Sequence, residues 1–369
     1  MSLNKHAVDT VPVWSWAAPL SAYLLLIFTF AGLVSADSSL VLLLAALLLG
    51  ASVFASVHHA EVVALRVGEP FGSIVLAIAV TVIEVALIVS IMLSAKDGAD
   101  VLARDTVFAT VMLVLNGIVG LCLVAGGVRH HEQSFQTSAS AAALSVLGTL
   151  AVITMVLPNY TLAAPGPVFA SSQLIFVGVV SVILYFVFLF IQTIRHRDYF
   201  LMLDDSSADT GSPEDVPSTR TALISVGLLC LALAAVVLLA KVLSPWLEGA
   251  VSAANLPKAF VGVVIAAVVL LPEGMAAVRA AAANRLQTSL NLALGSAMAT
   301  IGLTIPMVAI VALMLDQRLT LGLEPSGIVL LLLTLFISTV TLATGRTTIL
   351  QGAVHLVIFA VFMFLAAVP

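Results

Sequence analysis

SIVLAIAVTVIEVALIVSIMLSA, the stretch from Ser73 to Ala95, decides the fold class of this chain. Its only charged residue is Glu84, which lies near the middle. About 20 apolar residues suffice for a helix to cross a bilayer, so the stretch predicts a transmembrane helix. A charge at the bilayer centre costs roughly 2.5 kcal/mol or more, and an acid in such a place is by default a functional-site hypothesis.

A second stretch repeats this pattern in the other half of the chain. AFVGVVIAAVVLLPEGMAAV, from Ala259 to Val278, is also long and apolar and carries one acid, Glu273. Two membrane-buried glutamates, one in each half, predict the two parts of an ion site. The alternative is that each glutamate is protonated and hydrogen-bonded to a neighbouring helix.

Composition places the whole chain in the membrane class. Of its 369 residues, 62% are hydrophobic and 9% are charged, whereas soluble domains carry about 25% charged residues. No basic run suggests a nucleic-acid partner. Cys122 and Cys230 lie inside apolar stretches and do not indicate a disulfide framework.

Hydropathy predicts an all-α polytopic membrane protein of about eleven transmembrane helices. Only Thr344–Thr347 separate the last two apolar runs. These two runs could therefore form either a tight helical hairpin or a single broken helix. The predicted spans are 17–35, 39–60, 71–95, 105–127, 138–157, 170–194, 221–244, 257–281, 287–315, 325–344 and 348–367.

A hydrophilic segment divides these spans into two sets. Residues 195–220 hold six of the nineteen acidic residues together with Ser, Gly and Pro, which is typical of a disordered linker. We therefore predict an N-terminal region with the first helix (1–38), a five-helix repeat (39–194), an acidic cytoplasmic linker (195–220) and a second five-helix repeat (221–369). An odd number of spans in each repeat gives the two repeats opposite orientations, and transporters of this kind bind substrate near the midplane.

The loops predict the orientation of the chain. With the N-terminus in the cytoplasm, nine Lys and Arg residues lie on the cytoplasmic side and five on the outside. Because cytoplasmic loops are enriched in these residues, we expect a cytoplasmic N-terminus.

The residues beside the glutamates suggest how an ion is held. Pro272 and Gly274 flank Glu273, and Pro272 lacks an N–H group, so we expect a kinked or broken helix that exposes carbonyl oxygens. In the first half, no proline stands beside Glu84, and Thr81 lies three residues before it. Carboxylates with neutral oxygens suit Ca²⁺, Na⁺ or K⁺ as transported ions, and no cofactor is expected.

Each glutamate-bearing span is followed by a long span with small and polar residues at depth. Asn116 lies in the first of these spans, and Ser296 and Thr300 lie in the second, where they share a helical face. These side chains are candidates to support the ion site. Packing of small residues between helices is the alternative.

A histidine pair lies near the predicted end of the second span. His58, His59, Glu61 and Glu69 suggest a cytoplasmic entry that attracts cations, and a solvated helix end is the alternative. His355, inside the last predicted span, is expected to be a buried, hydrogen-bonded histidine rather than a proton relay.

Two long runs carry a family resemblance. HHAEVVALRVGEPFGSIVLAIAVTVIEVALIVS (His58–Ser90) and GVVIAAVVLLPEGMAAVRAAAANRLQTSLNLALGSAMATIGLTIPMV (Gly262–Val308) resemble the two signature regions of cation/proton exchangers in the calcium/cation antiporter superfamily. The resemblance is strongest to the bacterial ChaA-type antiporters. It implies ten core helices in two inverted halves, with Glu84 and Glu273 as the central acids.

The resemblance has one departure from the common pattern. VTVIE and LLPEG stand where the superfamily commonly has a GNAxE-type motif, so the asparagine of that motif is missing twice. The cation preference therefore stays open between Ca²⁺ and Na⁺ or K⁺.

The sequence thus predicts a secondary antiporter, not an enzyme, that exports Ca²⁺, Na⁺ or K⁺ in exchange for protons. Its expected partners are membrane lipid and the transported ions, its location is the bacterial inner membrane, and its oligomeric state stays open. A cation channel is the first alternative. A metal-dependent intramembrane hydrolase built on His58, His59 and Glu61 is a remote one, because no HExxH or GxSxG motif accompanies them.

Overall fold

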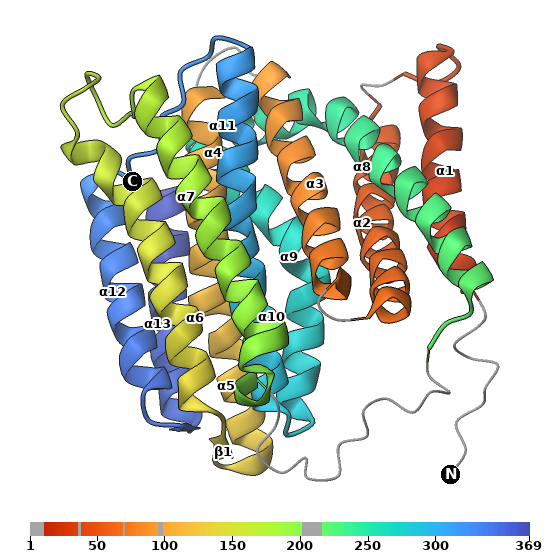
Figure 1. The fold of residues 1–369 in the computed structure, drawn as a ribbon. Coiled ribbons are helices and arrows are strands. Elements are labelled where there is room, and N and C mark those ends of the chain that lie inside the picture. Colours follow the sequence, from red (N-terminus) through yellow and green to blue (C-terminus); the bar gives the residue numbers. More distant parts are fainter. Residues whose placement is uncertain (1–10, 36–37, 69–70, 95–98, 201–215) are drawn as a thin grey trace. The chain divides into compact units, whose positions relative to one another are not determined.

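The computed structural model describes residues 11–35, 38–68, 71–94, 99–200 and 216–369. Within these ranges, eleven helical segments are long and apolar enough to cross a membrane (Figure 1). The predicted all-α membrane protein of eleven spans is therefore confirmed.

Thirteen α-helices and several irregular helical segments make up these spans. The α-helices are α1 Val13–Phe30, α2 Ser39–Val67, α3 Phe71–Ser94, α4 Ala99–Met112, α5 Val119–His130, α6 Thr137–Ala151, α7 Ser171–Phe190, α8 Thr219–Ala253, α9 Ala259–Ala282, α10 Leu286–Ala299, α11 Ile305–Met314, α12 Pro325–Leu342 and α13 Ile349–Ala367. The π-helical segments are η1 Leu113–Ile118, η2 Val152–Val156, η4 Ile191–Arg195 and η7 Thr300–Thr304, and the 3₁₀ turns are η3 Leu157–Tyr160 and η5 Arg197–Phe200.

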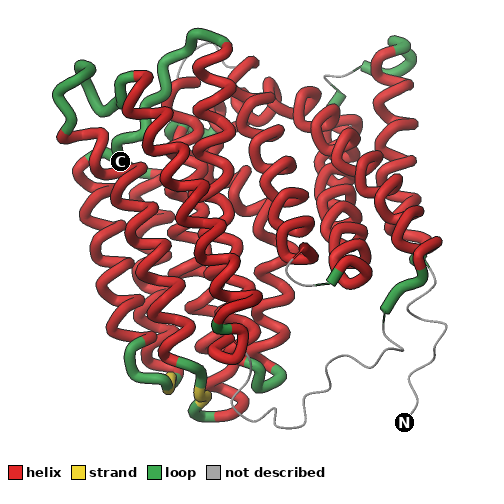
Figure 2. The backbone as a smooth tube through the Cα atoms, in the orientation of Figure 1, coloured by secondary structure: helices red, strands yellow, loops and turns green. Residues whose placement is uncertain are grey.

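Two short strands tie loops together at one end of the helices. β1 (Gln133–Ser134) pairs antiparallel with β2 (Arg346–Thr347), as Figure 2 shows. The second strand lies in the turn between α12 and α13. The last two spans therefore form a tight hairpin, which settles the alternative left open by the sequence.

The helices pack as two compact units. One unit contains residues 1–95 and 206–250, and the other contains residues 96–205 and 251–369. In the first unit, α2, α3 and α8 meet around the small cluster of Ala60, Ala79 and Leu229. Each unit thus draws on both predicted five-helix repeats.

Two central spans of the second unit share an unusual design. The first is α4–η1–α5 and the second is α10–η7–α11, and in each a 14-residue α-helix runs into a π-helical segment of 6 or 5 residues. They cross antiparallel, because α4 contacts α11 while α5 contacts α10. The third span of each predicted repeat therefore has the same irregularity and the opposite direction, which is what an inverted repeat requires.

Each π-helical segment packs on the last span of the other predicted repeat. η1 lies against α13 and η7 lies against α7. Glycines permit the close approach on both sides: a Cβ atom at Gly120 would lie 3.1 Å from His355 Cβ, and one at Gly302 would lie 2.7 Å from Tyr185 Cβ. Gly302 lies within η7, whereas Gly120 lies in α5, two residues after η1.

Several boundaries differ from the sequence prediction. α2 continues to Val67, so His58, His59 and Glu61 lie within the helix and not at its end. α4 begins at Ala99, which brings Arg104 out of the predicted loop and into the helix. The predicted linker begins with the 3₁₀ turn Arg197–Phe200, and its residues 201–215 lie outside the described part of the chain.

The seam between α13 and the central span should be sensitive to a single methyl group. A Cβ atom at Gly352 would lie 2.8 Å from the Val124 backbone nitrogen and 2.9 Å from the Gly120 oxygen. We expect Gly352→Ala to lower the free energy of unfolding by about 1–3 kcal/mol through overpacking, measured by thermal unfolding in detergent. Gly50→Ala is the matched control, since nothing lies within 4 Å of its added Cβ; equal loss in both variants would contradict the tight seam.

Candidate cation site

Glu84 lies in the middle of α3 and is almost completely buried, with 1% of its surface exposed. Thr81 lies three positions earlier, on the same face of the helix, and is also buried. The Thr81 hydroxyl has no hydrogen-bond partner among the described residues. A carboxylate and a hydroxyl that can supply oxygens therefore lie one turn apart in an apolar helix.

Glu273 lies in α9, and both of its carboxylate oxygens are shielded from solvent. α9 runs parallel to the central span α4–η1–α5, as two close approaches show. A Cβ atom at Gly262 would lie 2.8 Å from the Thr106 nitrogen, and one at Gly274 would lie 3.0 Å from Ile118. Glu273 is therefore at the level of the π-helical segment η1.

Of the two predicted forms of α9, kinked or broken, the broken one is wrong, and the kink stays a prediction. α9 is continuous from Ala259 to Ala282 and passes through Pro272, Glu273 and Gly274 without interruption. A proline within a helix removes one backbone hydrogen bond, and buried packing on its neighbours can hold the helix together across that loss. The irregular backbone lies instead in the adjacent span, at η1, and π-helical segments of this kind often occur at functional sites.

The hydroxyl-bearing candidates of the second repeat lie on its central span. Ser296 is in α10, and its buried Oγ has no hydrogen-bond partner among the described residues. Thr300 is buried and begins η7. Gly295, next to Ser296, faces open space, because nothing lies within 4 Å of a Cβ atom built there. Their role in holding a cation stays a prediction.

Asn116 lies in η1, and its side chain is hydrogen-bonded to residues of two other helices. Its Nδ2 donates to Thr334 Oγ1 of α12 at 2.9 Å, and its Oδ1 lies 3.2 Å from Nδ1 of His355 in α13. The expectation that His355 is buried and hydrogen-bonded is confirmed. A supporting role of Asn116 at a cation site stays a prediction.

The histidine pair of α2 joins helices within the first unit. His59 is fully buried, with Nδ1 3.3 Å from Ser225 Oγ of α8 and Nε2 3.2 Å from the Ser15 carbonyl oxygen of α1. The His58 ring lies 5.2 Å from the Trp14 ring. Glu61 is exposed, and Glu69 lies outside the described residues. His59 thus fastens α1 to α2 and α8, and the cytoplasmic entry stays a prediction.

No cluster of three or more His, Cys, Asp or Glu residues that could hold a metal ion occurs in the described part of the chain.

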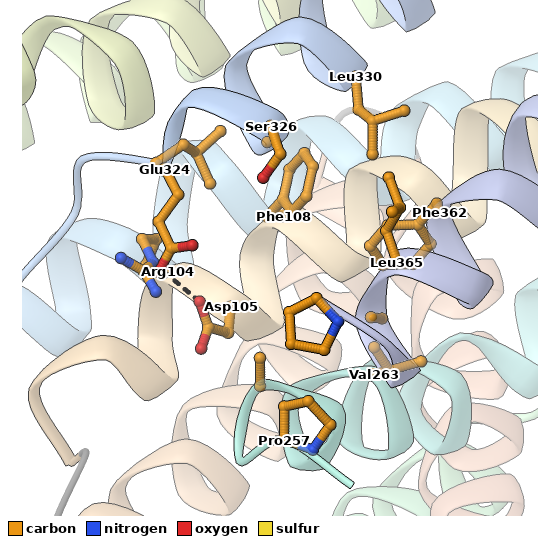
Figure 3. Close-up of a pocket in the computed structure, with 15 residues that line it drawn as sticks. Arg104, Asp105, Phe108, Pro257, Val263, Glu324, Ser326, Leu330, Phe362 and Leu365 are labelled. Atoms are coloured by element: carbon orange, nitrogen blue, oxygen red, sulfur yellow. Dashed lines mark hydrogen bonds and ion pairs between the residues drawn. The ribbon is translucent and has the colours of Figure 1, made fainter.

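A pocket of about 220 Å³ opens at the start of α4, α9 and α12 and the end of α13. Arg104, Asp105 and Glu324 lie at one end of it, and the opposite end is apolar (Figure 3). Val263 of α9 lines it, ten residues before Glu273, which at 1.5 Å per residue is about 15 Å along the helix. This pocket is therefore not the place where a cation would contact Glu273.

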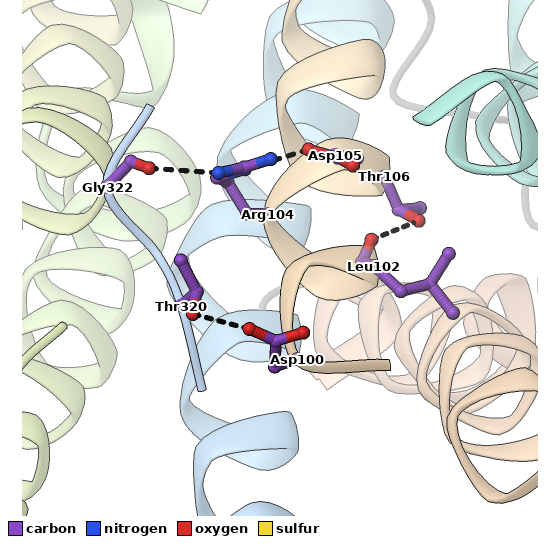
Figure 4. Close-up of polar contacts among 7 residues, drawn as sticks. All are labelled: Asp100, Leu102, Arg104, Asp105, Thr106, Thr320 and Gly322. Carbon is purple, nitrogen blue, oxygen red and sulfur yellow. Dashed lines mark hydrogen bonds and ion pairs between the residues drawn. The ribbon is translucent and has the colours of Figure 1, made fainter. Parts of the chain in front are cut away.

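Polar contacts at the start of α4 hold the loop before α12. Arg104 donates from Nε to Asp105 at 2.8 Å and from its guanidinium to the Gly322 carbonyl oxygen at 3.2 Å (Figure 4). Thr320 donates from its hydroxyl to Asp100 at 2.8 Å. These contacts could not be predicted from the sequence, because the predicted fourth span begins after Arg104 and leaves it in a loop.

Eleven apolar spans, two of which carry a glutamate with a buried carboxylate near the middle, are typical of a polytopic membrane transporter. The family model of the sodium/calcium exchanger protein matches residues 38–194 and 224–368. The chain therefore belongs to this family, within the calcium/cation antiporter superfamily.

Two bacterial relatives cover most of the chain. A protein of Sinorhizobium fredii, provisionally named ionic transporter y4hA, is 55% identical over 359 residues, which is 97% of each chain. The sodium-potassium/proton antiporter ChaA of Escherichia coli is 36% identical over 313 residues, which is 85% of this chain and 84% of the relative.

Solved structures share the fold. Native YfkE has a TM-score of 0.73 at 15% identity, covering 96% of this chain and all of the other. The H⁺/Ca²⁺ exchanger CAX has a TM-score of 0.69 at 14% identity, covering 95% of this chain and 89% of the other. The family consists of secondary transporters, so the prediction of an antiporter and not an enzyme is confirmed, and the channel and hydrolase alternatives lose their support.

Arg104 should contribute to stability because it is largely buried. The side chains of Arg104 and Asp105 are 10% and 11% exposed. Arg104→Met leaves the Asp105 carboxylate and the Gly322 oxygen without this donor, so we expect a loss of about 1–3 kcal/mol, measured by thermal unfolding in detergent. Arg346→Met is the control, because its ion pair with Glu132 is 74% and 50% exposed and such pairs contribute about 0–1 kcal/mol. An equal loss in both would contradict the burial argument.

Proposed function

We propose that this protein exports a cation from the cytoplasm in exchange for protons, with Glu84 and Glu273 each binding cation and proton in turn. The observation that carries the proposal is the place of these acids. Each lies in the middle of an apolar helix, in the second span of a predicted repeat, with its carboxylate away from solvent. ChaA of Escherichia coli, a sodium-potassium/proton antiporter by name, supports the same activity here.

The chemistry follows from the cost of a bare charge in the membrane. An ionised carboxylate without water or a counter-ion is unfavourable there. A bound proton neutralises it, and so does a bound cation, so the two compete for the same oxygens. A carrier whose site crosses only when it is loaded with one or the other exchanges cation for proton.

Neutral oxygens lie near each glutamate within its own unit. Thr81 offers a hydroxyl one turn from Glu84, and Ser296 and Thr300 offer hydroxyls on the span that packs against α9. The π-helical segments η1 and η7 shift the backbone hydrogen bonds in the middle of the second unit's spans. Irregular backbone at this depth is tolerated where protein buries it or it lines a cavity. Pro272 frees one carbonyl of α9 in the turn before Glu273.

The transported cation is Na⁺, K⁺ or Ca²⁺. The names of two relatives contain these ions. ChaA is named a sodium-potassium/proton antiporter, and a protein of Aphanothece halophytica, 25% identical, is named a Ca²⁺/H⁺ antiporter. A single carboxylate with hydroxyl and carbonyl oxygens can serve all three ions. We assign the protein to the bacterial inner membrane with its N-terminus in the cytoplasm, on the distribution of Lys and Arg among the loops.

The organisation supports a carrier that alternates its access. The two stretches matched by the family model, 38–194 and 224–368, correspond to the two predicted five-helix repeats. The central spans of these repeats are antiparallel. We propose that they form an inverted repeat, the arrangement in which substrate binds near the midplane.

Replacing either glutamate with glutamine should stop the exchange. Glutamine keeps the size and the hydrogen bonding of the side chain but cannot release a proton or supply a charge. In everted vesicles with an acid interior, we expect Na⁺, K⁺ or Ca²⁺ to release protons through the wild-type protein, followed with a pH-sensitive dye. Glu84→Gln and Glu273→Gln should reduce this release to the level of vesicles without the protein.

Glu132→Gln is the control, because Glu132 is exposed and forms a surface ion pair with Arg346. This variant should exchange ions like the wild type. Normal exchange in Glu84→Gln or Glu273→Gln would remove that residue from the site. A wild type that responds to none of the three cations would refute proton coupling itself, and the cation that gives the response at the lowest concentration identifies the preferred substrate.

A further inference from the structure

A buried chain of polar side chains joins η1 to α12 and α13 in the second unit. Its members are fully or almost fully buried within the apolar helices and lie on three different spans. They are Met112, Asn116, Thr334, Thr341 and His355. Polar groups in an apolar interior are costly unless they are hydrogen-bonded, so the geometry of this chain matters for the helices that carry it.

The hydrogen bonds fix the direction of the chain. Asn116 Nδ2 donates to Thr334 Oγ1 at 2.9 Å, and the Thr334 hydroxyl lies 3.4 Å from the Met112 sulfur, which can only accept. The same sulfur is 3.8 Å from Asn116 Nδ2, which places the nitrogen of the amide on this side. The amide oxygen therefore faces His355.

This direction determines where the proton of His355 lies. Asn116 Oδ1 is 3.2 Å from His355 Nδ1, and an amide oxygen can only accept, so Nδ1 carries the proton. His355 Nε2 is 3.2 Å from Thr341 Oγ1, whose hydroxyl then donates to it. A neutral histidine with its proton on Nδ1 uses both ring nitrogens.

The chain also reaches the helix of Glu273. Asn116 and Ile118 lie in the same six-residue segment, η1. Asn116 faces α12 and α13, whereas Ile118 contacts α9 at Gly274, the residue after Glu273. A shift of η1 would therefore change the packing beside Glu273.

We propose that His355 is a positioning residue for cation exchange. It holds the amide of Asn116 and thereby sets η1 against α9 beside Glu273. The proposal rests on the function proposed for Glu273. It places His355 away from the transported ion and assigns it an effect on how well the cation is bound.

Three substitutions of His355 test the contacts of its two ring nitrogens separately. Asparagine places its amide nitrogen near the position of Nδ1, glutamine places its amide nearer to Nε2, and leucine removes both contacts. We expect His355→Leu and His355→Gln to raise the half-saturating cation concentration about ten-fold, the size of one lost buried hydrogen bond. His355→Asn should stay within about three-fold of the wild type.

Ser338→Ala is the matched control. Ser338 lies in α12 between Thr334 and Thr341, is buried, and its hydroxyl has no hydrogen-bond partner among the described residues. Its half-saturating concentration should equal that of the wild type. Thermal unfolding in detergent shows how much of each variant is folded, so that a loss of protein is not taken for a loss of affinity.

Two results would overturn the proposal. A purely structural histidine would lower the amount of folded protein and leave the half-saturating concentration unchanged in all three variants. Equal values for His355→Asn and His355→Gln would show that the Nδ1 contact is not the one that matters. If the leucine variant does not fold, the comparison of asparagine with glutamine decides.

Nitrogen NMR of the ring gives a test that does not depend on transport. With ¹⁵N-labelled histidine, the signals missing from His355→Asn identify His355 among the seven histidines. We expect one protonated nitrogen, Nδ1, and one bare nitrogen, Nε2. A proton on Nε2 would overturn the hydrogen-bond chain. Absence of exchange in the wild type would instead refute the proposed function, with the ring signals still deciding the chain.

Discussion

The lack of water in the membrane interior is the constraint on which this structure depends. Every polar group placed there must be neutralised or hydrogen-bonded within the protein. The chain meets this requirement in different ways: Arg104 pairs with Asp105 near the end of a span, and His355 is hydrogen-bonded on both ring nitrogens. Under the proposed function, a cation and a proton would neutralise the carboxylates of Glu84 and Glu273 in turn.

The sequence predicted the spans well because hydropathy depends on composition over a long window. All eleven spans lie where apolar runs lie, and both central acids were found as isolated charges. Span ends were less predictable. α4 begins several residues before its apolar run, since Arg104 and Asp105 satisfy each other and so can enter the helix. The same local reasoning missed that α2 continues beyond its histidine pair, because it could not know that His59 is hydrogen-bonded to α1 and α8.

The irregular backbone was expected at the proline and lies elsewhere. Pro272 removes one N–H group but leaves α9 continuous, whereas η1 is π-helical without a proline, and η7 is π-helical just before Pro306 of α11. A π-helical segment depends on contacts with several neighbouring helices. These contacts cannot be predicted when the sequence of each helix is considered by itself. A signal was nevertheless present: Thr334, Ser338 and Thr341 lie on one face of an apolar helix, and that face meets Asn116 and His355.

The two glycine contacts of the central spans show what the polar chain adds. In one central span, Tyr185 of α7 packs against Gly302 of η7. This contact brings the last helix of one predicted repeat against a π-helical segment of the other. In the other central span, His355 of α13 packs against Gly120 of α5, two residues after η1, and here directional hydrogen bonds to Asn116 and Thr341 are added. Packing tolerates small rotations of a helix, whereas a hydrogen bond weakens steeply when its angle changes. The hydrogen bond between Asn116 and His355 therefore limits the rotation of the segment beside Glu273, as the proposed role of His355 requires.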